Sequence, residues 1–356
     1  MSVSSEFGRF VWGPAQLSRS MTGNGDLFQL DDANDGVGAA FVCPRSGTIT
    51  HIGWTMASKG ETPNNYYAGL VVPSTTVQQL TATAYGGSAP GTFDGNALAV
   101  GFHWTALATN GTAVAGDHIG IAIWPTGSPG APDTTNKIGV GYTNTPSSAN
   151  NAPLAFGGNA PAMAAVTRLP AFAVKFSDGE VYGWPLLDAA YTAYDTADSP
   201  DEVGVKFTVP YAMRCIGMVV NLTSVEANAP YTVILYSAAD AVLASWAVTD
   251  AGEMNEEGQI EFCWSSAVAL SADTVYRSTI LAMHGSYTVL PASGTWPDAA
   301  TKTAYHQGAA FIATSRTDAG AWTDNTDATV FMSPIVDQVT LPDAGGSTGG
   351  TFAFIG

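Results

Sequence analysis

Residues that could carry out catalysis are sparse and scattered in this sequence. No two histidines have the i, i+4 spacing with which a helix presents a pair of metal ligands. The only Gly-X-Ser-X-Gly match, 345–349, lies in a glycine-rich stretch without the strand and helix that a nucleophilic serine requires. Among 30 acidic residues, no spacing selects a carboxylate pair for glycoside hydrolysis. We therefore predict no catalytic residues and no enzymatic activity. The histidines are His51, His103, His118, His284 and His306.

One acidic cluster has the oxygen density of a calcium loop. It contains Asp31, Asp32 and Asp35. Ala33 stands where such a loop needs an oxygen ligand, however, and Val42 stands where it needs a bidentate glutamate. Clusters of Asp, Asn and Gly more often form plain turns. We therefore predict no metal and no cofactor, with calcium at the three aspartates as a weak alternative.

The three cysteines do not form a shared structural feature. Cys43, Cys215 and Cys263 cannot all pair, and no CxxC spacing of a zinc site is present. They fall at different positions of the internal repeat described below. We predict three buried free thiols.

The charge balance excludes one class of partner. The chain has a net charge of −18 with only 12 Lys and Arg, and charged residues make up 12% of it, about half the usual share. No cluster of basic residues is available to bind phosphates, so we predict no nucleic-acid binding. No signal peptide and no apolar stretch near 18 residues is evident, so we predict no membrane insertion.

The elements that position these residues occur twice. The segment 35–41 (DGVGAAF) is answered by 201–207 (DEVGVKF), and Phe102-His-Trp104 is answered by Phe262-Cys-Trp264. The offset between matching positions falls from 166 to 160, so the second copy has lost residues between the matching segments, as loops do. Each copy is long enough to be a domain with its own core. Features that repeat are expected to serve the fold, and features that do not repeat are the better candidates for function.

Most segments of the chain have the pattern of short strands. Residues 118–124 place three isoleucines on one face, and residues 231–236 and 329–332 are rich in β-branched and aromatic residues. Helix signals are nearly absent. The sequence therefore predicts an all-β protein with two tandem β-sandwich, jelly-roll-like domains and extended terminal arms. The boundaries are an N-terminal arm at 1–30, module one at 31–176, a connector at 177–200, module two at 201–340, and a Gly-rich linker with an apolar tail at 341–356.

Aromatic residues are assigned by whether they repeat. The repeated pairs Phe102/Trp104 and Phe262/Trp264 are predicted to pack in the core, with sugar stacking as the minor alternative. Apolar residues in the two terminal segments are predicted anchors for attachment, and the alternative is that each arm folds back on its own sandwich. These anchors are Phe7, Phe10, Trp12, Phe352, Phe354 and Ile355. Candidate platforms for glycan stacking are Trp54, Trp124, Trp184, Trp296 and Trp322.

Several segments together resemble a known group of proteins. The segments are 41–53 (FVCPRSGTITHIG), 176–179 (FSDG), 199–204 (SPDEVG), 270–277 (LSADTVYR) and 316–323 (RTDAGAWT). The chain resembles uncharacterised virion-associated structural proteins of tailed bacteriophages over nearly its whole length. These motifs are turn and strand signatures, so no functional residue is carried over from the group.

The resemblance implies a component of a virus particle. We expect a non-enzymatic structural protein on the virion surface, either a capsid decoration or fibre component or a tail component, held by its terminal segments. Its expected partners are other virion proteins and further copies of itself in a homo-oligomer. It would be made in the host cytoplasm and released with the particles. The alternative from another class is a carbohydrate- or receptor-binding adhesion module that contacts a host surface glycan.

Overall fold

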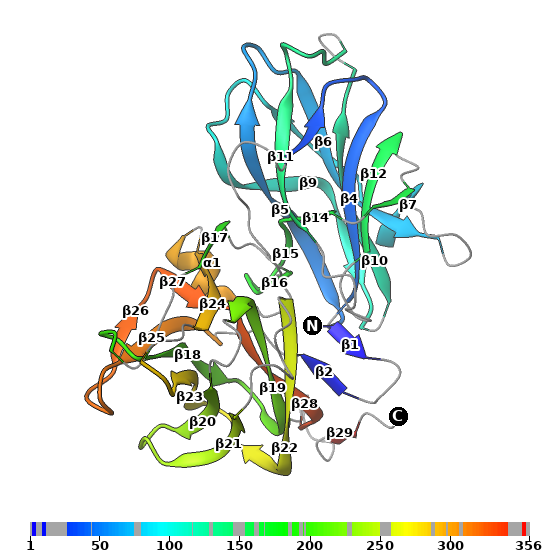
Figure 1. Cartoon of the computed structure of the whole chain (residues 1–356). Coiled ribbons are helices and arrows are strands. Elements are labelled where there is room, and N and C mark those ends of the chain that lie inside the picture. Colours follow the sequence, from blue (N-terminus) through cyan, green and yellow to red (C-terminus); the bar gives the residue numbers. More distant parts are fainter. Residues whose placement is uncertain are drawn as a thin grey trace. The chain divides into compact units, whose positions relative to one another are not determined.

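The structure is a computed structural model that describes most of the chain. The described residues are 2–4, 9–11, 27–43, 45–74, 80–115, 117–127, 131–144, 154–159, 164–166, 168–183, 187–191, 195, 197–225, 230–249, 258–285, 289–296, 298–305, 309–340 and 351–353. Within them the chain is nearly all β, with one short helix, α1 (Ala299–Ala304), and one 3-10 turn, η2 (Tyr85–Gly87) (Figure 1). The predicted all-β class is confirmed, and the jelly-roll order of the strands stays a prediction. No helix among the described residues is long and apolar enough to cross a membrane.

The chain forms two compact units, which we call the first and second modules. The first contains most of residues 20–187, and the second contains residues 188–356 together with residues 2–19. The predicted N-terminal arm is therefore divided between the modules. The predicted connector is divided too, because residues 181–183 form a strand of the first module and residues 187–191 pair with a strand of the second.

The first module is built from two antiparallel sheets among the described residues. One contains, in sheet order, β13 (Ala164–Val166), β12 (Leu154–Asn159), β4 (Asp35–Val42), β10 (His118–Pro125), β6 (Asn65–Pro73) and β7 (Leu80–Ala84), with β8 (Gly91–Asp94) also on β6. The other contains β14 (Arg168–Pro170), β11 (Ile138–Asn144), β5 (Gly47–Lys59), β15 (Phe172–Phe176) and β16 (Val181–Gly183), with β3 (Leu27–Leu30) on β11 and β9 (Gly101–Ala113) on β5.

The described residues of the second module also form two antiparallel sheets. One contains β21 (Val242–Val248), β20 (Tyr231–Ser237), β23 (Thr274–Ala282), β18 (Glu202–Val209), β25 (Ile312–Arg316) and β26 (Thr323–Asn325). The other contains β1 (Ser2–Ser4), β2 (Arg9–Val11), β28 (Met332–Thr340), β19 (Ala212–Val225), β24 (Val289–Thr295) and β17 (Leu187–Tyr191), with β22 (Gly258–Leu270) on β19, β27 (Ala328–Val330) on β24 and β29 (Thr351–Ala353) on β28.

The two copies of the sequence repeat have the same pairing between their central strands. In the first module β4 pairs with β10 and β12, and β10 pairs with β6; in the second, β18 pairs with β23 and β25, and β23 pairs with β20. The long strand β5 pairs with β9, β11 and β15, as β19 pairs with β22, β24 and β28. The central strands of the two modules thus have equivalent partners, whereas the strands at the sheet edges differ.

Alternation along the repeated strands forms the two cores. In β10, Ile119, Ile121 and Ile123 are fully buried, as their spacing of two predicts. The sheets of each module face one another, since the ring of Trp54 in β5 lies 4.4 Å from that of Phe93 in β8. In the second module Tyr231 of β20 packs edge-on against Phe262 of β22.

The repeated aromatic pairs occupy different faces in the two modules. Phe262 and Trp264 are buried, which confirms the core assignment for the second module. In the first module Trp104 pairs with Gly53, whereas the neighbouring Trp54 is fully buried, so Trp104 projects from the face opposite the core. The core prediction for Phe102 and Trp104 is therefore wrong. The physical reason is register: Gly53 faces Trp104, but its counterpart Gly217 faces Cys263, and a shift of one residue reverses the face of every side chain.

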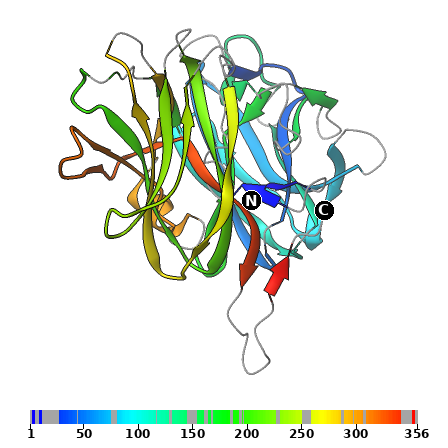
Figure 2. The same ribbon diagram turned by 60° about the horizontal axis from the view of Figure 1, so that its bottom comes forward.

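The outer edge of β28 is covered by two strands distant in sequence. Phe10 and Val11 of β2 pair with Val336 and Ile335. Further along, Phe352 of β29 pairs with Val339. Figure 2 shows β29 beside β28. In the first module the equivalent edge, that of β15, is covered by β16, which follows β15 directly in the chain.

Candidate functional site: a tryptophan–arginine cluster on the second module

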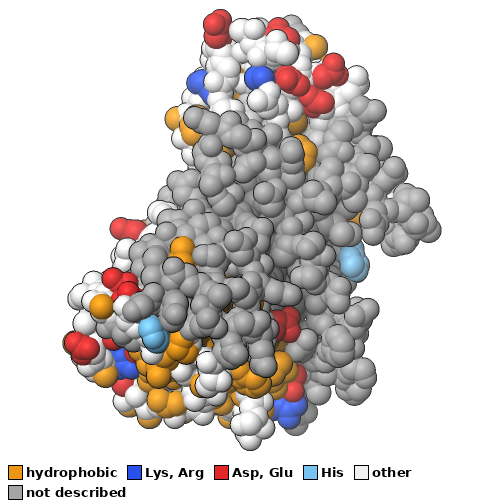
Figure 3. All heavy atoms as spheres, in the orientation of Figure 1, with side chains coloured by type: hydrophobic (Ala, Val, Ile, Leu, Met, Phe, Trp, Pro, Cys, Tyr) orange, Lys and Arg blue, Asp and Glu red, His pale blue; other side chains and the backbone are white. Residues whose placement is uncertain are grey.

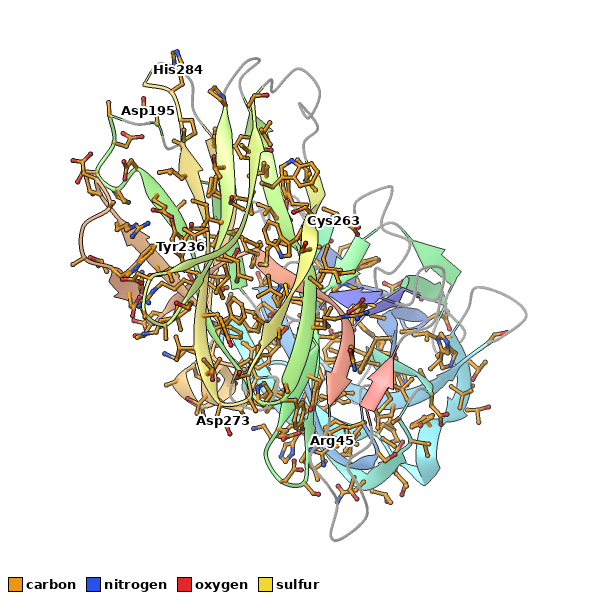
Figure 4. The ribbon with its side chains drawn as sticks, turned by 90° about the horizontal axis from the view of Figure 1, so that it is seen from below. Arg45, Asp195, Tyr236, Cys263, Asp273 and His284 are labelled. Carbon is orange, nitrogen blue, oxygen red and sulfur yellow. The ribbon has the colours of Figure 1, made fainter. Side chains whose placement is uncertain are left out.

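The outer face of the β18 sheet carries an unusual concentration of charge. Strand alternation buries Val203, Val205 and Phe207, so Glu202 and Lys206 project from the opposite face. Cross-strand pairing adds Arg316 next to Glu202 and Arg277 next to Lys206. We call this group, completed by Tyr236, Trp322, Asp240 and Asp324, the Trp322 cluster; Figure 4 labels Tyr236 within it.

Trp322 is the centre of the cluster. It comes just before β26, and its indole Nε1 donates a hydrogen bond to Asp240 Oδ1 at 2.7 Å. The guanidinium carbons of Arg316 and Arg277 lie 4.2 Å and 5.2 Å from its ring centroid. The attraction of a cation to the aromatic quadrupole therefore holds two arginines at one ring.

Arg316 also forms the most buried ion pair among the described residues. Its Nε donates to Glu202 Oε2 at 2.6 Å, and the side chains of Arg316 and Glu202 are only 10% and 2% exposed. The Arg316 Nη2 donates to the Tyr236 hydroxyl at 2.7 Å. Burial, followed by the Glu202 charge, raises the pKa of Tyr236 to about 12, so this phenol stays protonated at neutral pH.

Asp324 balances the second pair of cations. Lys206 and Arg277 are direct cross-strand neighbours, which is unfavourable for two like charges. Asp324 Oδ2 accepts from Lys206 Nζ at 2.6 Å, and Asp324 Oδ1 accepts from Thr314 at 2.8 Å and lies 3.7 Å from Arg277. Burial alone would raise the pKa of Asp324, but these hydrogen bonds and cations outweigh it and the pKa is lowered.

Arg277 is the one incompletely satisfied member. Its side chain is 12% exposed, and its ion pairs with Asp240 and Asp324 are both long, at 3.7 Å. Its buried Nε has no hydrogen-bond partner among the described residues. A buried donor without an acceptor is costly, so the Arg277 Nε lowers the stability of the cluster, and its burial keeps it out of reach of a bound molecule. The half-buried ring of Trp322 and the exposed carboxylate of Asp240 are the members of the cluster that can contact a ligand, through stacking and hydrogen bonds.

The predicted glycan platforms differ in accessibility. Trp54 and Trp296 are buried, and their Nε1 atoms donate to Thr105 and to the Phe311 carbonyl, so neither indole can face a sugar. Trp124 is half-buried and packs on an apolar cluster of the first module. Trp322 is half-buried in the polar cluster, and Trp184 lies outside the described residues.

The predicted attachment residues are placed in part. Phe10 and Phe352 lie in β2 and β29, and both strands pair with β28. Phe7, Trp12, Phe354 and Ile355 lie outside the described residues. The N-terminal segment thus adds a strand to the second module and not to the first module that follows it in the chain.

In the segment of the weak calcium alternative, the carboxylates of Asp32 and Asp35 accept hydrogen bonds from the backbone of their own turn. Asp35 Oδ2 accepts the backbone N–H groups of Asp31 and Asp32 at 2.9 Å and 2.8 Å, and Asp32 Oδ1 accepts that of Asn34. Burial raises the pKa of Asp35. The described residues contain no group of three or more His, Cys, Asp or Glu side chains arranged to hold a metal.

The thiol prediction needs one correction. Cys43 and Cys215 are buried, and burial raises the pKa of Cys215 to about 11. Cys263 is exposed, because the register of β22 that turns Phe262 and Trp264 inward turns the residue between them outward. None of the three forms a disulfide.

Sequence reasoning missed the Trp322 cluster apart from Trp322 itself, although a signal was present. Within the repeated segment, Gly36 and Ala40 correspond to Glu202 and Lys206, whereas the alternate positions keep their apolar character. Reading the repeat by strand face would have identified the two unrepeated charges on one outward face. The arginines and Asp324 come from strands whose pairing is not visible in the sequence.

No family model, curated protein or solved structure matches the chain.

Proposed function

We propose that this protein is a non-enzymatic structural component of a tailed-phage virion, exposed on the particle surface as a capsid decoration, fibre or tail component. The observation that carries the proposal is the shared edge of β28, where β2 and β29 are added as strands. Strand addition at a sheet edge is a general way to fasten one β-rich chain to another. β29 makes three residue pairs there and is joined to β28 by a glycine-rich segment, so it can be transferred to a neighbouring virion protein at little cost.

The charge distribution supports an outward-facing role. Every lysine and arginine side chain that the structure describes is engaged with a carboxylate, a carbonyl or side-chain oxygen, or an aromatic ring. The net charge of −18 therefore leaves an acidic surface without available cations in the described part of the chain. Such a surface favours contact with solvent and with other proteins over contact with packaged nucleic acid.

Deletion of residues 346–356 tests attachment. The expected result is an almost unchanged melting temperature, because β29 contributes few contacts, together with loss of incorporation into particles. The measurement is thermal unfolding of the purified protein and quantification of the protein in purified virions. The control exchanges residues 346–350 for a serine- and glycine-rich segment of the same length, which keeps β29. Normal incorporation of the truncated protein would contradict attachment through this segment.

The second candidate function is binding of a host surface glycan, and the Trp322 cluster favours it. Trp322 offers a partly accessible ring, and Asp240 offers an exposed acceptor. Sugars are bound by this combination of an aromatic face with hydrogen-bonding groups that fix the hydroxyls.

A glycan array followed by titration of the positive glycans tests this second function. Trp322→Ala is expected to weaken binding at least tenfold, because it removes the ring, whereas the matched variant Trp124→Phe in the first module is expected to bind normally. No binding by the unmodified protein at high micromolar glycan, or equal binding by both variants, would contradict it.

A further inference from the structure

The charges of the Trp322 cluster differ in their access to solvent. The side chains of the two arginines that lie against Trp322 are only 10% and 12% exposed. Lys206 is more exposed but is held by Asp324 at 2.6 Å. By contrast, the Asp240 side chain is 47% exposed, and Trp322 is half-buried. A molecule that approaches the cluster therefore meets an aromatic ring and a carboxylate before it meets a cation.

Asp240 retains an acceptor oxygen that a ligand can reach. Its Oδ1 accepts the Trp322 Nε1 hydrogen bond at 2.7 Å and lies 3.7 Å from Arg277. Its Oδ2 has no hydrogen-bond partner among the described residues. An ionised carboxylate only accepts hydrogen bonds, so the group that binds at Oδ2 must be a donor, such as a hydroxyl.

The backbone fixes Asp240 and Trp322 before any ligand binds. Asp240 lies in the hairpin between β20 and β21, where the Ser237 N–H donates to the Ala241 carbonyl at 2.9 Å. Trp322 follows the turn 317–320, which is closed by a backbone hydrogen bond of 2.8 Å. The bond between the indole and the carboxylate joins the two loops. Groups that are already held in place lose less conformational entropy when a ligand binds.

The charges near the ring disfavour both kinds of charged ligand. The guanidinium carbons of Arg316 and Arg277 already lie 4.2 Å and 5.2 Å from the ring centroid, so they repel a further cation that would stack there. An anion is repelled by the exposed Asp240 and by the net charge of −18. Figure 3 shows more acidic than basic side chains on the described part of the face in view.

We infer that the Trp322 cluster selects neutral glycans and that Asp240 is the residue that determines this specificity. The inference rests on the second candidate function, glycan binding, and names the class of its ligand. The apolar face of a neutral sugar ring stacks on Trp322, and a hydroxyl at the edge of that ring donates to Asp240 Oδ2. A uronic acid brings a second carboxylate to Asp240, and an amino sugar brings an ammonium group to a ring that two arginines already contact.

An array of glycans matched in size and different in charge tests the inference with the full chain. Its members end in a neutral hexose, in the corresponding hexuronic acid or in the corresponding amino hexose. The neutral member of each set is expected to bind at least about tenfold more tightly than either charged member at neutral pH. The discrimination against the hexuronic acid is expected to decrease as the salt concentration rises, because salt screens the exposed Asp240.

Asp240→Asn separates the charge of this residue from its shape. The amide oxygen can still accept the Trp322 Nε1 hydrogen bond, so the melting temperature is expected to stay nearly unchanged. The discrimination against the hexuronic acid is expected to be largely lost, because the repelling charge is gone. The matched control is Asp32→Asn in the first module, which removes the same charge from another exposed carboxylate that accepts a backbone N–H. This control is expected to keep the full discrimination.

The outcomes distinguish the inference from the function on which it rests. If glycans bind and Trp322→Ala weakens them, but a charged member binds as tightly as the neutral one, the inference is wrong and glycan binding stands. Unchanged discrimination in Asp240→Asn leads to the same conclusion for the role of Asp240. If no member of the array binds, glycan binding fails and the inference fails with it.

Discussion

The two modules use the same strands to build the same core, yet their outer faces differ in chemistry. At inward positions Val37 and Phe41 match Val203 and Phe207, and all four are buried. At outward positions Gly36 and Ala40 are replaced by Glu202 and Lys206.

The side chains that cover the outer face of β4 in the first module differ in chemistry from those that cover β18 in the second. In the first module Ala40 and Ala122 lie under Leu80, with Trp124 packed against them, and a side chain at Gly38 would approach Leu80 Cδ1 to 2.4 Å. In the second module the same positions are covered by Trp322 and its arginines. Beneath the apolar side chains of the first module only small residues fit. Beneath Trp322 and its arginines in the second module, each charged residue needs a partner of opposite charge. The duplication therefore preserves the core and leaves the outer face free to acquire a separate role.

The largest expected effect comes from placing the charge of the second module in the first. Ala40→Lys puts a cation among the apolar side chains of Val71, Leu80 and Ala122 and also overfills the site. We expect the free energy of unfolding to fall by about 4–5 kcal/mol. Denaturant unfolding measures the loss, and hydrogen exchange of β4 peptides localises it to the first module. An unchanged unfolding free energy would show that the outer face of β4 is open to solvent.

The next largest effect is expected in the second module, from Arg316→Ala. This variant leaves Glu202, which is 2% exposed, with the neutral hydroxyls of Thr279 and Tyr236 as hydrogen-bond partners in place of a cation. We expect a loss of about 3 kcal/mol, because an unpaired carboxylate is then buried. In the double variant Arg316→Ala with Glu202→Leu most of the loss is expected to be recovered, since no charge remains. If the single and double variants unfold at the same denaturant concentration, the ion pair is not the cause.

The smallest effect concerns pH. The pKa of Asp324 is lowered from its ordinary value of 3.8, so its contribution to stability is present above that pH and is lost as the pH falls through the lower folded-state value. Because Asp324 is partly exposed, the difference in unfolding free energy between the unmodified protein and Asp324→Asn is expected to be at most about 1 kcal/mol at neutral pH. That difference should decrease as the pH falls below the ordinary pKa and vanish below the folded-state pKa, as measured by denaturant unfolding from neutral pH into acid. A difference that stays constant over this range would contradict an electrostatic origin.

Some residues of the candidate site can be predicted from the sequence, and others cannot. Trp322 was named as an aromatic platform, and the repeat contained Glu202 and Lys206 as departures from the first copy. Arg277 and Arg316 come from two further strands, and only cross-strand pairing brings them to one ring. The sequence favours Trp54 and Trp296 as platforms as much as Trp322, because composition does not distinguish a buried indole from an exposed one.

The duplication, the all-β class and the inward residues of the central strands follow from the sequence, because a strand with period two needs only local alternation to define its buried face. The tertiary structure alone decided register and neighbours. It turned Trp104 and Trp264 to opposite faces and brought β2 and β29 to one edge of β28. Register depends on which residues of two distant strands face one another, and a shift of one position reverses every side chain without changing the pattern along either strand.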